Sequence, residues 1–84
     1  MKRTATSSRA NGVVETGTIK FLDFEGGFYG IVGDNGRHYD PENLDRLFRV
    51  DGLRVQFTVR VIQDRFSIHM WGTLVSVVNM QKLV

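Results

Sequence analysis

The sequence predicts an all-β fold, a five-stranded barrel with one short helix between the third and fourth strands. Apolar and polar residues alternate in several segments, most clearly in LRVQFTVRV at residues 53–61. Glycine-containing turns separate these segments, and a helical spacing of apolar residues occurs only at residues 44–48. With 84 residues, the chain has room for one hydrophobic core and therefore for one domain.

The first three strands are expected to form a meander. The first of them is rich in Val, Thr, Ile and Phe, and Gly17 within it indicates a bulge or a sharp bend. Gly26-Gly27 and Asn35-Gly36 supply the two turns, because glycine adopts positive φ without strain. The three strands are predicted over residues 13–24, 28–33 and 37–39.

After the third strand, the pattern changes from a period of two to a helical period. Asp40 is a suitable N-cap, and Pro41 fits the first position of a helix. Apolar residues then follow at a spacing of three and four, namely Leu44, Leu47 and Phe48. We therefore expect a short helix that closes one end of the barrel.

The fourth strand is the clearest one, and one of its faces is expected to supply much of the core. That face consists of Leu53, Val55, Phe57, Val59 and Val61. Each such side chain contributes ~1.5–3 kcal/mol when it is fully buried.

A fifth strand is predicted from residue 66 to about residue 78, with a bulge at Gly72. Under strict alternation, one set of its side chains points into the barrel and the other set points outward. The inward set is Phe66, Ile68 and Met70, and the outward set is Ser67, His69 and Trp71. The last residues, 79–84, are expected to be frayed.

This order of elements is that of an OB-fold barrel. A small β-roll of the SH3 type is the alternative, although it accommodates a helix between the third and fourth strands less well. The barrel domain is expected over residues 13–80. A polar, basic N-terminal tail at residues 1–12 precedes it and is expected to be disordered.

Composition excludes several kinds of site. The chain has no cysteine, which excludes disulfides, thiolate metal sites and cysteine nucleophiles. No apolar run reaches the ~18–20 residues that span a membrane, and no apolar region of a signal peptide follows the basic N-terminus. We expect a soluble, cytoplasmic protein without a membrane partner, and an exported form whose leader precedes residue 1 stays open.

The basic pI of about 9.4 originates in the tail. Lys2, Arg3 and Arg9 lie there without any acidic residue, which leaves eight basic and nine acidic residues in the rest of the chain. The tail is expected to be solvated, and a basic arm that contacts phosphates is the alternative. A nearly neutral barrel weakens the argument that the whole domain is a phosphate-binding surface.

The segment GTIKFLDFEGGFYGI at residues 17–31 resembles the opening of cold-shock domains, GTVKWFN followed by KGFGFI. DGLRVQF at residues 51–57 is similar to the EGQxVxF segment of that family. The resemblance implies binding of single strands by stacking of bases on aromatic side chains. The matching surface residues would be Lys20, Phe21 and Phe28. Gly30 replaces the second phenylalanine of KGFGF, and the family's second aromatic motif, VFVHF, has no counterpart.

A larger part of the chain resembles a group of small, mostly uncharacterised prokaryotic OB-fold-like proteins. The shared pattern is GGFYGI, YDPxNL, DGLRVxF and IHMWG, here at residues 26–31, 39–44, 51–57 and 68–72. This resemblance implies the fold and no established activity. Some members of the group are exported, which is the reason why an exported form stays open.

The candidate nucleic-acid-binding residues lie on the expected outer face: Lys20, Phe21, Phe28, Arg54 and Arg60. Bases would stack on the two phenylalanines, at ~1–3 kcal/mol each, and the cations would contact phosphates. The structural alternatives are phenylalanines in the core and arginines on a solvated face, paired with a carboxylate such as Glu15, Asp23 or Asp64.

His69 and Trp71 are the candidate residues for an alternative function, protein interaction without nucleic-acid binding. Trp71 is the only tryptophan, and an exposed tryptophan is frequently a hot spot of an interface. Packing of Trp71 against the core or the helix is its structural alternative.

The sequence favours a non-enzymatic binding module over an enzyme. His38 and His69 lack metal-ligand spacing, and Ser67, two residues from His69, does not form a nucleophile–base pair with an orienting acid. The acidic residues Asp40, Glu42 and Asp45 are interpreted as helix caps and solubilising groups. No cofactor and no metal is therefore expected, and the ligand is expected to be single-stranded RNA or DNA, or alternatively another protein.

Overall fold

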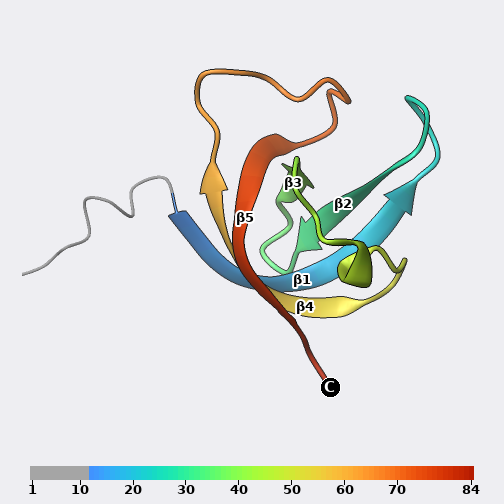
Figure 1. The fold of residues 1–84 in the computed structure, drawn as a ribbon, viewed down its shortest axis with the longest axis vertical. Coiled ribbons are helices and arrows are strands. Elements are labelled where there is room, and N and C mark those ends of the chain that lie inside the picture. The colour runs from blue at the N-terminus through green and yellow to red at the C-terminus, as the bar shows by residue number, and fades with distance from the viewer. Residues whose placement is uncertain (1–11) are drawn as a thin grey trace, which may run out of the picture.

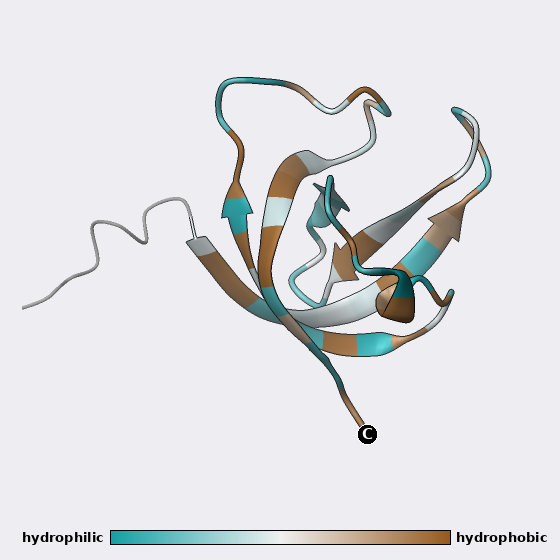
Figure 2. Ribbon diagram, viewed as in Figure 1, coloured by the Kyte–Doolittle hydropathy of each residue, from teal (hydrophilic) through white to brown (hydrophobic). Residues whose placement is uncertain are grey.

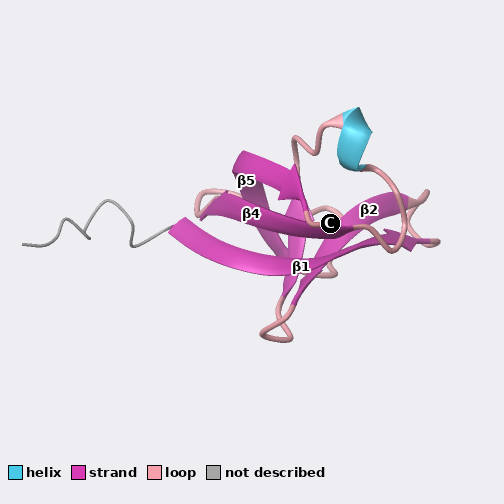
Figure 3. Cartoon of the chain, turned by 90° about the horizontal axis from the view of Figure 1, so that it is seen from below, coloured by secondary structure: helices cyan, strands magenta, loops and turns pink. Residues whose placement is uncertain are grey.

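The computed structural model describes residues 12–84, which form a closed barrel of five strands (Figure 1). The strands are β1 (Gly12–Leu22), β2 (Phe28–Gly33), β3 (His38–Pro41), β4 (Arg54–Val61) and β5 (Thr73–Lys82). A single 3₁₀ turn, η2 (Arg46–Phe48), lies between β3 and β4 and stands beside the strands in Figure 3. The predicted all-β, OB-fold-like barrel is confirmed. Gly12, assigned to the tail, belongs to β1, and the rest of the predicted tail lies outside the described residues.

The barrel closes in the strand order β1-β2-β3-β5-β4. β1 pairs with β4 through its first part and with β2 through its second part, and the two ladders overlap at Gly17 and Thr18. A Cβ at Gly17 would lie 2.5 Å from the carbonyl oxygen of Val32, so the two strands approach each other there as closely as only glycine allows. All ladders are antiparallel except that between β3 and β5, which is parallel.

Side chains from all five strands meet in one core. β4 contributes Val55, Phe57 and Val59, each at most 1% exposed, which confirms the predicted inward face of this strand. On its opposite face, Arg54 and Arg60 are exposed. The buried apolar cluster consists of Ile19, Ile31, Tyr39, Leu44, Val55, Phe57, Val59 and Val75.

The helix predicted after the third strand is reduced to η2. Asp40 and Pro41, expected at its beginning, belong to β3 because they pair with β5. Asp45 caps η2 instead, and its carboxylate accepts a hydrogen bond from the amide of Leu47 at 2.9 Å. Leu44, just before the turn, is buried in the core cluster, whereas Leu47 is 78% exposed. Among the described residues, no helix is long and apolar enough to cross a membrane.

The last strand lies later in the chain than predicted. β5 begins at Thr73 and continues to Lys82, which pairs with Val55 of β4. Residues 79–82 are therefore part of a ladder, and the prediction of a frayed end there is wrong. Residues 62–72, most of which were assigned to the strand, form an irregular connection that we call loop L45; it arches over the barrel at the top of Figure 1.

Candidate binding site

Loop L45 packs on the outer face of β2 and β3, on the same side of the barrel as the β1–β2 hairpin (Figure 1). In OB-folds, this face and these two loops bind oligonucleotides and oligosaccharides. A cleft of about 310 Å³ opens there. Its lining includes Phe21, Phe28, Tyr29, Asp40, Arg49 and His69. The position of this cleft makes it the first candidate for a binding site.

Asp40 is the buried anchor of loop L45. This residue is 3% exposed, and its Oδ2 accepts hydrogen bonds from the hydroxyl of Ser67 and from Nδ1 of His69, the latter at 2.6 Å. The backbone amide of His69 donates in turn to Oγ of Ser67 at 3.0 Å. The interpretation of Asp40 as a helix cap is therefore wrong, because its carboxylate attaches the loop to β3.

The imidazole of His69 covers one face of Phe28. The two ring centroids lie 3.7 Å apart and the planes are almost parallel, at 4°. Phe28 is consequently only 8% exposed. A nucleic-acid base could stack on this face of Phe28 only if His69 moved away.

Trp71 is the second ring through which the loop attaches to the barrel. It lies so close to Gly30 that a Cβ at position 30 would overlap the indole. The indole also stacks on His38, with centroids 4.4 Å apart and an interplanar angle of 10°. Gly72 allows the chain to pass close to β3, because a Cβ there would lie 2.7 Å from the carbonyl oxygen of His38. Trp71 therefore packs on β2 and β3, and neither in the core nor against the short helix, the two places given as its structural alternative.

The same loop directs its large apolar side chains into solvent. Phe66, Ile68 and Met70 are 95%, 84% and 91% exposed, so their predicted inward orientation is wrong. The physical reason is that Ser67, His69 and Trp71, predicted to point outward, turn toward β2 and β3 and leave the alternate positions on the outside. In Figure 2, apolar segments of this loop alternate with polar ones.

A second cleft of about 350 Å³ adjoins the exposed side chains of the loop. Phe66, Ile68, Leu74 and Pro41 form its apolar walls. Charged and polar residues complete the lining, namely Asp40, Glu42, Arg65 and His69. The surface around loop L45 therefore carries projecting apolar side chains beside an apolar hollow.

The five predicted nucleic-acid-binding residues do not gather at one place. Phe21 and Phe28 both line the first cleft, but Lys20, Arg54 and Arg60 do not. Phe21 is 44% exposed, whereas Phe28 is buried beneath His69. Among the described residues, the basic side chain that lines this cleft is Arg49, which was not predicted to bind nucleic acid.

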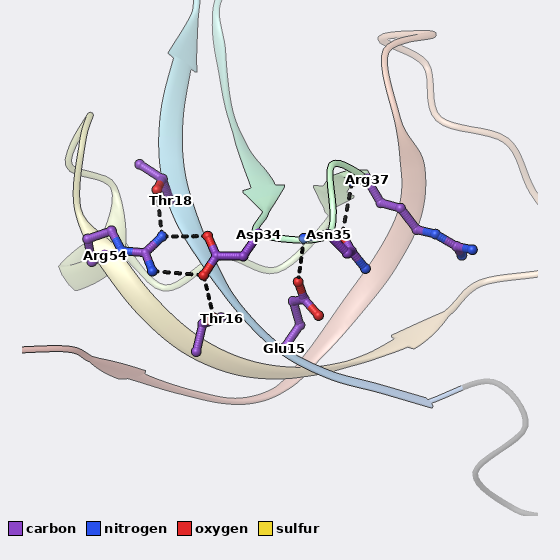
Figure 4. Close-up of polar contacts among 7 residues, drawn as sticks. All are labelled: Glu15, Thr16, Thr18, Asp34, Asn35, Arg37 and Arg54. Carbon is purple, nitrogen blue, oxygen red and sulfur yellow. Dashed lines mark hydrogen bonds and ion pairs between the residues drawn. The ribbon is translucent and has the colours of Figure 1, made fainter.

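Arg54 is occupied by a carboxylate in a network on the outside of the barrel (Figure 4). Its two terminal nitrogens donate to the two carboxylate oxygens of Asp34, at 2.7 and 2.8 Å. The hydroxyl of Thr16 donates to the same carboxylate, and Arg54 also donates to Thr18. These hydrogen bonds, above all those from Arg54, hold the pKa of Asp34 well below its ordinary value and raise the pKa of Arg54. A paired arginine was the structural alternative, although its partner is Asp34 and not one of the three acids considered.

The site contains residues that the sequence analysis did not identify as functional, chiefly Asp40 as an anchor and Phe66, Ile68 and Met70 as a surface. One signal for them was present in the sequence. The residues Gln63-Asp64-Arg65 are typical of a loop, and polar residues also occupy the nearby positions 67 and 69. If residues 66–72 are assigned to a loop and not to a strand, exposure of their apolar side chains is the expected result.

Among residues 12–84, no group of three or more His, Asp or Glu residues is arranged to hold a metal ion. The hydroxyl of Ser67 donates to Asp40 and not to the imidazole of His69, so the geometry of a nucleophile–base pair is not formed by these two residues. No family model matches this chain. A search of curated proteins also found no significant match.

Proposed function

We propose that this protein is a non-enzymatic binding module whose partner is another protein, and that loop L45 is its contact surface. The observation that carries the proposal is the exposure of Phe66, Ile68 and Met70, at 84–95%, on a loop that is firmly attached to the barrel. Contiguous exposed apolar patches on soluble domains mark interaction sites. The nearly neutral charge of residues 12–84 fits a polypeptide partner better than a polyanion.

The attachment of the loop supports the same conclusion. Asp40 holds Ser67 and His69, while Gly30 and His38 accommodate Trp71. A loop that serves only to connect β4 and β5 would gain stability from burying its apolar side chains, at ~1.5–3 kcal/mol each. A surface that is already fixed in one conformation also loses less entropy when a partner binds.

Single-stranded nucleic-acid binding is the second candidate, and one observation favours it. Phe21 lines the first cleft together with Arg49, and Phe24 lies in the turn between β1 and β2. Both phenylalanines are 44% exposed. Bases stack on such rings at ~1–3 kcal/mol each. This candidate ranks second because His69 covers Phe28 and Asp34 occupies Arg54.

Photo-crosslinking tests the proposed function. A photoreactive phenylalanine analogue is placed at position 66 or 68, and as a control at position 14 or 78, where Val14 and Val78 are 68% and 56% exposed elsewhere on the barrel. In cells that produce the protein, discrete polypeptide adducts are expected from positions 66 and 68 only. The absence of adducts, or equal adducts from all four positions, would contradict the proposal.

Oligonucleotide titration tests the second candidate in parallel. Labelled oligo-dT and oligo-rU are added at two salt concentrations to the protein with and without residues 1–11. Submillimolar, salt-dependent binding that persists without these residues and is lost in Phe21→Ala would establish nucleic-acid binding. Binding that disappears together with residues 1–11 would show only that a basic peptide contacts phosphate.

A further inference from the structure

The surface around loop L45 has a shape that can be complementary to itself. Phe66 and Ile68 project from it and are 95% and 84% exposed. Both side chains also form walls of the 350 Å³ cleft, together with Leu74 and Pro41. In a two-fold symmetric dimer the same patch occurs on both subunits, so the projecting residues of one copy can enter the hollow of the other.

The charges at the rim of this cleft can also be complementary to themselves under two-fold symmetry. Glu42 and Arg65 both line it, and their side chains form an ion pair of 3.0 Å that remains partly exposed. Each copy therefore brings one acidic and one basic group to the same rim. A two-fold rotation can place Arg65 of one copy opposite Glu42 of the other, and the nearly neutral net charge of residues 12–84 adds little repulsion between copies.

The apolar area is large enough to matter. Phe66, Ile68 and Met70 are almost fully exposed and together present on the order of 500 Å². A stable interface covers roughly 800 Å² on each partner. The three side chains alone account for more than half of such an area, and apolar surfaces are typical of homodimers.

We propose that the occupant of this surface is a second copy of this chain, and that loop L45 forms the centre of a two-fold symmetric homodimer. This inference rests on the proposed function and names its partner. Phe66 and Ile68 of each copy pack into the cleft of the other, and Glu42 and Arg65 pair across the rim.

Sedimentation equilibrium of the full chain over a range of concentrations tests the inference. The expected result is a reversible increase to twice the 9.6 kDa mass of the chain. Phe66→Ser and Ile68→Ser are each expected to raise the dimer dissociation constant by at least about tenfold, because they remove the centre of the interface. Val14→Ser, the matched control on β1, is expected to leave it unchanged.

Charge-swapped variants provide a readout that a merely structural role of these residues would not change. Glu42→Arg makes the rim basic, and Arg65→Glu makes it acidic, so each variant alone is expected to associate more weakly than the wild type. An equimolar mixture of the two is expected to form heterodimers, because opposite rims then face each other. Failure of this mixture to associate more strongly than its components would overturn the proposed pairing.

The two proposals fail in different ways. A wild type that stays monomeric up to near-millimolar concentration, or a dimer that is unaffected by Phe66→Ser and Ile68→Ser, overturns the homodimer. If the crosslinks from position 66 then join the chain to a different polypeptide, the proposed function stands without the homodimer. If the chain is monomeric and no crosslinks form, both proposals are wrong.

Discussion

β4 and loop L45 both alternate polar and apolar residues, yet they bury opposite sets. β4 buries Val55 and Phe57 and exposes Arg54, whereas the loop buries Ser67 and exposes Phe66. β4 lies between β1 and β5 and forms ladders with both, so its backbone groups have hydrogen-bond partners on both sides. Burial of its apolar side chains then determines which face turns inward. Loop L45 takes no part in a ladder, and a buried carboxylate decides its orientation instead.

Apolar periodicity therefore predicts that residues alternate between two faces, but not which of the two faces is buried. In a strand, burial of apolar area selects the face. In loop L45, the stabilisation comes from hydrogen bonds to Asp40 and from the rings packed on Phe28 and Gly30. The apolar set that this arrangement leaves in solvent is the basis for the proposed protein-binding function.

The largest effect on the free energy of unfolding is expected for a core residue of β4. Phe57→Ala removes a ring that is 1% exposed and leaves a cavity in the core. The free energy of unfolding is expected to fall by about 3–5 kcal/mol, measured by urea denaturation. A loss below about 1 kcal/mol would show that β4 does not carry the core as described.

A somewhat smaller effect is expected at the anchor of loop L45. Asp40→Asn replaces the carboxylate that accepts hydrogen bonds from Ser67 and His69. The free energy of unfolding is expected to fall by about 1.5–3 kcal/mol, and amide exchange at residues 66–72 is expected to accelerate. Asp23→Asn, at an exposed carboxylate, is the control and is expected to change neither quantity.

The packing of Trp71 on Gly30 can be tested by fluorescence, since Trp71 is the only tryptophan of the chain. Gly30→Ala introduces a Cβ that overlaps the indole, so the ring has to move outward. A loss of about 1–3 kcal/mol in stability and a red-shifted emission are expected. Gly36→Ala is the control: it strains a turn with φ of 87° but has no atom within 4 Å of its Cβ, so the emission is expected to stay unchanged.

The exposed set of the loop is expected to contribute little to the stability of one chain. Phe66→Ser removes a side chain that is 95% exposed. At a concentration at which the chain is monomeric, the free energy of unfolding is expected to change by no more than about 0.5 kcal/mol. A loss as large as that of Phe57→Ala would show that Phe66 is buried, and the contrast between the two regions would disappear.

The smallest effect concerns the outward face of β4, where Arg54 pairs with Asp34. The pKa of Asp34 is lowered in the folded state, so its carboxylate stabilises the fold above the ordinary pKa of about 3.9 and this contribution is lost as the pH falls further. Asp34→Asn is therefore expected to be slightly less stable than the wild type at neutral pH. The difference is expected to shrink below about pH 4 and in high salt, since the pair is exposed. A difference that grows in acid would contradict this assignment.

The sequence was sufficient for the barrel because its signals are local. The glycine turns and the alternation of β4 each depend on neighbouring residues, and the structure has both of them. The orientation of loop L45 depends on Asp40, which lies 27 residues before Ser67 and 29 before His69. Alternation could not reveal such a contact, because it arises only when β3 and β5 have paired.

The prediction of Asp40 as a helix cap failed for a related reason. Asp followed by Pro is a good helix start, but the β3–β5 ladder uses the same residues, and pairing in the barrel outweighs a local capping preference. Trp71 was singled out because it is the only tryptophan. The contact between its indole and Gly30 links two residues that are 41 positions apart in the sequence, and no periodicity of the sequence predicts it.

Loop L45 is attached to the barrel through His69 and Trp71 and turns Phe66, Ile68 and Met70 outward. Nuclear Overhauser contacts in the intact chain test this arrangement most directly. We expect cross-peaks between the rings of His69 and Phe28 and between the indole of Trp71 and the Hα protons of Gly30. Cross-peaks from the side chains of Phe66 or Ile68 to core residues such as Ile31 and Val75 would contradict the claim, because they would place the apolar set of the loop inside the barrel.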